Sequence, residues 1–305
     1  MPPIVRGLIR LILPLTVAFL IAGTVLSLGG LRGTLTFTPL LGAVLVMLLV
    51  RFLPPHLKQE NPLADLPRAA ALRGFKPILG FALLYPLLVI PVIIWTRVSP
   101  IPLLPGISTN WIFTFNYAIV AKVVLLGIPT LWLAWRYGGG KKHLGFIGFG
   151  HPWLWLGTLV AAGVDVALNP TWRFIFERPL PPLGVDVGIV LLAFAFAGLP
   201  EELLYRVLLQ TRLEILIGRW PGLAISSVLF GLMHYPSRYG LVWYGSTGSP
   251  AIDALVTLAF DFSIYVSGGL VFAYLWMRFR NAWIIIGGHT VYDAVALIGQ
   301  AAYGT

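Results

Sequence analysis

The stretch VGIVLLAFAFAGLPEELLYR, residues 187–206, runs from an apolar segment directly into two glutamates and an arginine. The apolar part is typical of a transmembrane helix, where a central charged residue costs on the order of 2.5–3.5 kcal/mol. Because proline lacks an amide hydrogen, we expect the helix to break or kink at Pro200 and to restart with Glu201 and Glu202. Glu202 and Arg206 share one helical face and can pair, which leaves the carboxylate of Glu201 available.

The composition of the whole chain is that of an integral membrane protein. Of its 305 residues, 58% are hydrophobic and 10% are charged, and the mean hydropathy is +0.88. Cysteine is absent, which excludes disulfides, thiolate metal sites and cysteine nucleophiles. The 21 Lys and Arg residues give a net charge of +10, but they are scattered between apolar runs. A role in membrane topology therefore explains them better than a nucleic-acid partner does.

The spacing of the apolar runs predicts an all-α, polytopic transmembrane helical bundle with about nine spans. The expected spans lie near residues 8–29, 36–53, 77–95, 112–135, 153–168, 186–216, 221–235, 253–277 and 282–303. The fifth and seventh are short, so eight spans is the alternative. The first follows Arg6 and Arg10 and resembles a signal peptide, but it is long and lacks a clear cleavage site. We expect it to be a retained helix.

The distribution of positive charge predicts the orientation. With the N-terminus inside, most Lys and Arg residues fall in segments that would face the cytoplasm. We therefore expect an integral, multi-pass protein of a bacterial or archaeal cytoplasmic membrane, with its N-terminus inside and its C-terminus outside.

Ionisable residues within the predicted spans concentrate in the second half of the chain. In FGLMH, Phe230 and His234 share a helical face, and in HTVYD, His289 and Asp293 do the same. A lone membrane histidine is usually an interhelical hydrogen bonder, and EELLYR alone could be an ordinary acidic helix N-terminus. If the polar faces of these three segments were buried separately, each would add its own cost of insertion. Buried together, their side chains can hydrogen-bond and pair with one another. The pattern predicts one intramembrane site.

Other polar residues have simpler explanations. Lys122 and Asp165 are the comparable residues in the first half, and each can pair with a neighbouring helix. Asp261 is better explained as an interhelical hydrogen bonder than as a fifth member of the site, and Asp253 as a possible helix N-cap.

The residue types in the predicted site suit amide hydrolysis. A glutamate and a histidine can together deprotonate a water molecule, and a carboxyl group in a dry environment is a stronger base than in water. A second histidine followed one turn later by an aspartate can hydrogen-bond the oxyanion of a tetrahedral intermediate. No serine or cysteine nucleophile is needed.

The three segments EELLYR, FGLMH and HTVYD resemble the ordered motifs of the CPBP intramembrane protease family. That family includes the type II CAAX prenyl proteases and bacterial bacteriocin-processing or self-immunity relatives, and the resemblance covers roughly residues 185–303. It implies that Glu201 and His234 activate water and that Arg206 holds Glu202 as support. His289 and Asp293 would stabilise the oxyanion.

One position departs from the CAAX-processing members, which have asparagine where this chain has Asp293. An ionised aspartate would repel an oxyanion, so Asp293 would be protonated, orient His289 or bind a cation. The resemblance also implies a catalytic helical core over residues 151–305. Residues 1–150 would then be an N-terminal extension of about four spans that serves substrate access or partner binding.

The sequence thus predicts an intramembrane glutamic-type endopeptidase that needs no obligatory cofactor. Its partners would be membrane lipid and a membrane-associated or prenylated peptide or protein, and no nucleic acid. Three alternatives stay open. They are a metal-dependent version of the same protease, a proton- or ion-coupled transporter, and a non-catalytic immunity or binding protein. In the metal-dependent version, a divalent metal such as zinc would be held by Glu201, His234, His289 and Asp293.

Overall fold

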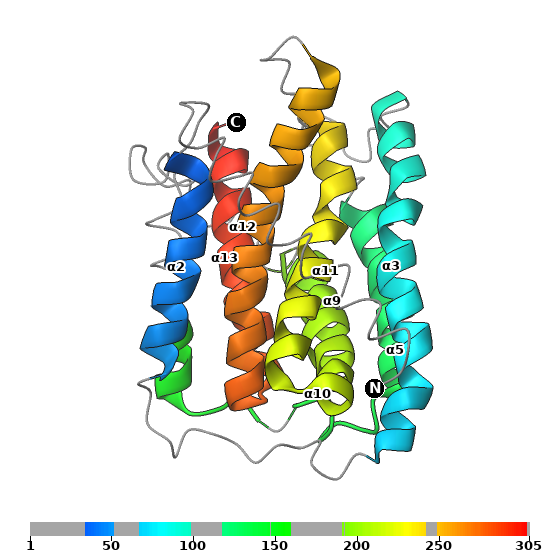
Figure 1. Ribbon diagram of the computed structural model, residues 1–305, viewed down its shortest axis with the longest axis vertical. Coiled ribbons are helices and arrows are strands. Elements are labelled where there is room, and N and C mark those ends of the chain that lie inside the picture. Colours follow the sequence, from blue (N-terminus) through cyan, green and yellow to red (C-terminus); the bar gives the residue numbers. More distant parts are fainter. Residues whose placement is uncertain are drawn as a thin grey trace.

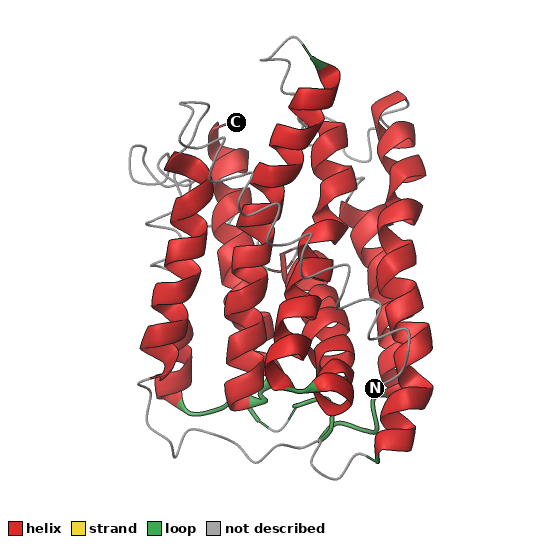
Figure 2. Cartoon of the chain, in the orientation of Figure 1, coloured by secondary structure: helices red, strands yellow, loops and turns green. Residues whose placement is uncertain are grey.

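The computed structural model of the chain describes residues 34–51, 67–98, 118–146, 148–159, 191, 193–241 and 249–303. The regular structure in these ranges is helical throughout (Figure 2), which confirms the all-α prediction for the described residues. The elements are α2 (Thr34–Arg51), α3 (Arg68–Val98), η2 (Ala118–Gly127), α5 (Ile128–Tyr137), η4 (Phe194–Gly198), α9 (Leu199–Glu202), η5 (Leu203–Gln210), α10 (Thr211–Ile217), α11 (Arg219–Leu241), α12 (Pro250–Phe279) and α13 (Ala282–Tyr303). The segments labelled η are π-helical.

The long helices lie side by side along the longest axis of the molecule (Figure 1). Helix α12 packs between α2 and α11, and α11 also packs against α3. One hydrophobic core joins residues from both sides of position 150, including Ile78, Ala121, Leu204 and Trp276. The predicted N-terminal extension and the predicted core therefore share buried apolar surface.

Apolar side chains also cover the outside of the bundle. Leu87 on α3 is 61% exposed, and Trp135 on α5 is 79% exposed. Within the described residues, Arg68–Ile94 and Val120–Tyr137 are long and apolar enough to cross a membrane, whereas Gly42–Arg51 and Ile264–Phe279 are shorter apolar helices. An apolar exterior is what a helical bundle in lipid requires.

Most of the predicted spans coincide with helices where the structure describes them. The expected span at 282–303 has the bounds of α13, and that at 253–277 lies within α12. Helix α3 begins at Arg68, inside a segment that the sequence predicts to be a connection. Residues 68–76 are rich in Ala and Arg, which favour a helix without being apolar enough to count as a span. The expected first span, 8–29, lies outside the described residues.

Of the break or kink predicted at Pro200, the break is wrong, because helical backbone runs from Ala193 to Ile217. Leu199, immediately before the proline, has φ −71° and ψ −58°, and its amide bonds to the carbonyl oxygen of Phe194 in a π-helical turn. Such local π-helical adjustment accommodates proline within membrane helices, because the hydrogen bonds shift by one residue around the missing donor. Glu201 and Glu202 consequently sit in mid-helix.

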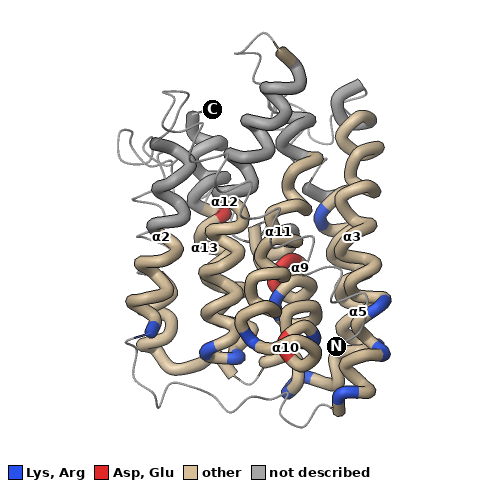
Figure 3. Tube along the Cα trace, viewed as in Figure 1, with Lys and Arg blue, Asp and Glu red and all other residues tan. Residues whose placement is uncertain are grey.

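Most described Lys and Arg residues gather at one end of the bundle (Figure 3). This end contains the C-termini of α2, α5 and α12 and the N-termini of α3, α11 and α13 (Figure 1). A guanidinium nitrogen of Arg278, near the end of α12, donates to the carbonyl oxygen of Arg51 at the end of α2, 2.9 Å away. Where the structure describes them, the segments predicted to carry the cytoplasmic positive charge thus meet on one side of the molecule.

Candidate active site

Glu201 lies at the centre of the site and its side chain is only 1% exposed. The first carboxylate oxygen, Oε1, is 2.5 Å from the Nζ of Lys122 on η2. The second, Oε2, is 3.7 Å from the Nε2 of His234 on α11 and 3.8 Å from the Nε2 of His289 on α13. The two oxygens therefore have different surroundings, one facing a cation and the other facing both histidines.

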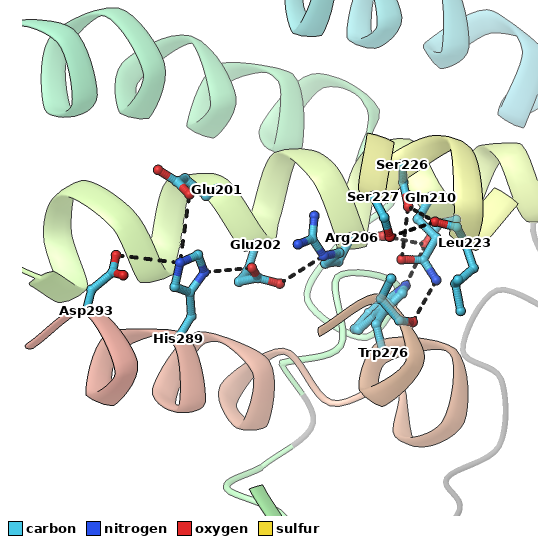
Figure 4. A network of polar contacts seen from close by, with 12 residues as sticks. Glu201, Glu202, Arg206, Gln210, Leu223, Ser226, Ser227, Trp276, His289 and Asp293 are labelled. Atoms are coloured by element: carbon cyan, nitrogen blue, oxygen red, sulfur yellow. Dashed lines mark hydrogen bonds and ion pairs between the residues drawn. The ribbon is translucent and has the colours of Figure 1, made fainter. Parts of the chain in front are cut away.

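Glu202, in the motif EELLYR, contacts His289, in the motif HTVYD. Its Oε1 accepts a hydrogen bond from the Nδ1 of His289 at 2.7 Å, and its Oε2 lies 3.4 Å from the Nε of Arg206 (Figure 4). The predicted Glu202–Arg206 pair is confirmed. The guanidinium of Arg206 also lies 4.3 Å from the centre of the Phe230 ring, a cation–π distance. Arg206 thereby links the motif EELLYR to Phe230 in the motif FGLMH.

His234 is oriented by the carbonyl oxygen of Phe230, one turn earlier in α11, which lies 2.9 Å from its Nδ1. Because a carbonyl oxygen only accepts, Nδ1 carries the hydrogen. In the neutral ring, Nε2 then presents its lone pair toward Glu201. The ring of Tyr265 on α12 stacks on the His234 ring, with the two centroids 3.9 Å apart and an angle of 9° between the ring planes.

His289 is bordered by three acidic side chains. Besides Glu201 and Glu202, the Oδ2 of Asp293 lies 3.5 Å from its Nε2 (Figure 4). Phe272 stacks against the same ring, with centroids 4.8 Å apart and an angle of 13°. Carboxylate oxygens thus lie near both ring nitrogens, and because a carboxylate only accepts hydrogen bonds, the ring is placed to carry a hydrogen on each nitrogen.

Lys122 is a charged residue of the site that the sequence does not assign to it. The sequence predicts that Lys122 pairs with a neighbouring helix, which its contact with Glu201 confirms, and that the carboxylate of Glu201 is left available. The structure corrects the second expectation, since Lys122 faces that carboxylate. The signal in the sequence was a single lysine within the apolar segment AIVAKVVLLG. Asp253 and Asp261 lie within α12, whereas Asp165 lies outside the described residues.

Within the described ranges, no group of three or more His, Cys, Asp or Glu side chains is placed to hold a metal ion. The ammonium group of Lys122 beside Glu201 would also repel a divalent cation there.

Gly198 lets α13 approach the helix that carries Glu201. A Cβ at this position would lie 2.3 Å from the Oγ1 of Thr290 and 2.8 Å from the carbonyl oxygen of Ile286, both on α13. Because His289 precedes Thr290, this close approach helps to place the imidazole beside the two glutamates. A residue larger than glycine would force the helices apart or force a side chain to move.

We expect Gly198→Ala to destabilise the fold by about 1–3 kcal/mol, because the new methyl group overpacks the contact with α13. The matched control is Gly80→Ala on α3, where a new Cβ meets nothing within 4 Å. There the higher helix propensity of alanine should stabilise by about 0.5–1 kcal/mol. Thermal unfolding of both variants in detergent measures the difference. Equal shifts would show that the approach at Gly198 is not tight.

Comparison with known proteins identifies one related family. Residues 183–295 match the family described as type II CAAX prenyl endopeptidase Rce1-like. No curated protein and no solved structure matches the chain. The matched range includes all three motifs, from EELLYR to HTVYD, which confirms the family resemblance inferred from them. Lys122 lies outside that range.

Proposed function

We propose that the protein is an intramembrane endopeptidase of the glutamic type, because residues 183–295 match the Rce1-like family of type II CAAX prenyl endopeptidases. One observation carries the proposal. The buried Oε2 of Glu201 faces the Nε2 atoms of His234 and His289 at 3.7 Å and 3.8 Å. In this proposal Glu201 is the base, His234 is a hydrogen-bond acceptor and His289 is a hydrogen-bond donor, and the three groups meet at one buried position.

The separations around Glu201 suit a water nucleophile. They exceed a direct hydrogen bond, and one water molecule can bridge two polar groups so placed. Glu201 Oε2 takes one proton from this water, while the lone pair on His234 Nε2 accepts a hydrogen bond from the O–H that remains. The water oxygen attacks the peptide carbonyl carbon, and the carbonyl electron pair moves onto its oxygen. Glu201 then passes the proton to the leaving amine as the C–N bond breaks.

His289 is placed to stabilise the oxyanion. Its Nδ1–H is used by Glu202, so Nε2–H is the group that donates to the developing negative charge. Asp293 lies beside this ring and would stabilise its positive charge and orient it. Of the three roles expected for Asp293, orientation of His289 is the one we propose.

The proposal includes the membrane setting. We propose about nine spans, with the N-terminus and the positively charged end of the bundle facing the cytoplasm. The apolar exterior and the membrane-length helices Arg68–Ile94 and Val120–Tyr137 support it. The substrate would be a membrane-associated or lipid-modified peptide or protein, and the residues before position 150 would guide its access.

A test uses the purified protein in detergent with matched prenylated and unprenylated peptides that carry a C-terminal CAAX sequence. We expect cleavage at an internal bond, with mass spectrometry of the products locating it. The rate should stay unchanged after thorough chelation, because the base and the oxyanion donor are side chains. The control is a zinc peptidase treated in parallel, which must lose activity.

The possible outcomes separate the alternatives. Absence of cleavage of both peptide types, with the fold intact, would contradict the proposed function and favour a binding protein. Loss of activity with chelator and its return with zinc would establish the metal-dependent version. Cleavage of the unprenylated peptide alone would confirm the endopeptidase and reject a prenylated substrate.

A further inference from the structure

Lys122 contributes a charge to the site from a part of the chain that the Rce1-like match does not cover. It lies in η2 (Ala118–Gly127), and its side chain is 8% exposed. Element η2 packs against both η4 and α9, which flank and contain Glu201. The preceding residue, Ala121, accepts a hydrogen bond at 3.2 Å from the hydroxyl of Tyr85 on α3. Neighbouring helices on two sides thus hold the backbone at Lys122.

The two buried glutamates each face a different cation. Arg206 lies against Glu202 and the Phe230 ring, while Lys122 lies against Glu201. An ionised carboxylate out of contact with water is stable only when charged or hydrogen-bonding groups compensate it. The contact at 2.5 Å between Lys122 Nζ and Glu201 Oε1 supplies that compensation.

The same contact distinguishes the two oxygens of Glu201. The terminal torsion of a glutamate is broad, so a carboxylate that nothing holds can rotate about it. With Oε1 held by Lys122, Oε2 is the oxygen turned toward His234 and His289. A base displaced by about 1 Å can lose about 100-fold in rate.

We propose that Lys122 is a positioning residue of this peptidase site. It holds Glu201 through Oε1 and thereby directs Oε2 toward the water-binding position between the two histidines. The proposal rests on the proposed function. It also implies that residues 183–295 do not contain the whole site.

The kinetic test compares Lys122→Met and Lys122→Arg with Lys76→Met, which removes an exposed lysine on α3. Lys122→Met should lower kcat by about 100-fold because the carboxylate is no longer held. It should leave KM nearly unchanged, because the interaction acts on the reacting groups and not on substrate binding. Lys122→Arg keeps the charge and the donors and should recover part of kcat. Lys76→Met should behave as the wild type.

A stability measurement tests the pairing without using activity. Lys122→Met and Glu201→Gln should each lower the melting temperature in detergent, because each leaves half of a buried ion pair. The double variant should melt above the Lys122→Met single variant, because the two effects are coupled. If Lys122→Met does not fold, the kinetic comparison uses Lys122→Gln, which retains a donor without the charge.

The outcomes distinguish this proposal from the one on which it rests. If Glu201→Gln is inactive while folded Lys122→Met keeps the wild-type kcat, the positioning role is wrong and the proposed function stands. Additive melting shifts in the double variant would also overturn it. If Glu201→Gln retains full activity, or if the wild type is inactive, both proposals fail.

Discussion

Glu201→Gln is expected to lower kcat for peptide hydrolysis by about 10²–10⁴-fold, the contribution typical of a general base. The amide of glutamine has nearly the size of the carboxylate, but it cannot take the proton of the attacking water. The oxyanion donor His289 and the surrounding bundle stay in place. KM should change little, because the lost interaction acts in the transition state.

The measurement is steady-state cleavage by purified protein, with size-exclusion chromatography as the check of folding. The matched control is Glu214→Gln on α10, a glutamate that pairs with Arg280 away from the site. This variant also loses a mostly buried ion pair, so it should lose stability but retain turnover. Wild-type kcat in Glu201→Gln would show that Glu201 is not the base.

Arg206→Met is expected to destabilise the fold by about 3–5 kcal/mol. The side chains of Arg206 and Glu202 are both fully buried, so the variant leaves the Glu202 carboxylate without its guanidinium partner. It also removes the cation–π contact with Phe230. Chemical denaturation in mixed micelles, followed by tryptophan fluorescence, measures the free energy of unfolding.

Two further variants make this prediction specific. Arg206→Met combined with Glu202→Gln should recover much of the lost stability, because replacing both members of a buried pair is far less costly than removing one. Arg136→Met on α5 removes an exposed arginine and should change stability by less than about 0.5 kcal/mol. Similar losses in Arg206→Met and Arg136→Met would mean that the buried pair contributes little.

The membership of the site could be predicted largely from the sequence because ionisable residues are rare within its apolar segments. Glu201, His234 and His289 lie on different helices, and the cost of burying each alone favours a common location. The Glu202–Arg206 pair followed from helical spacing. The prediction of the site thus rested on the cost of inserting charged residues into the membrane and on the spacing of residues along a helix.

The local geometry around Pro200 could not be predicted in the same way. Proline in isolation predicts a break, whereas the π-helical turns on both sides let the helix continue. The start of α3 was also missed, because a hydropathy window does not detect helical residues that lie beyond the apolar span.

The helical class, the membrane setting and the set of motif residues follow from the amino-acid sequence, because hydropathy and helical period are properties of the chain alone. The contacts of Lys122 with Glu201 and of Glu202 with His289 are known only from the packing of the helices. These contacts join residues far apart in sequence, so they depend on how the helices pack. That packing also decides which oxygen of Glu201 faces the histidines, and therefore which atom we assign as the base.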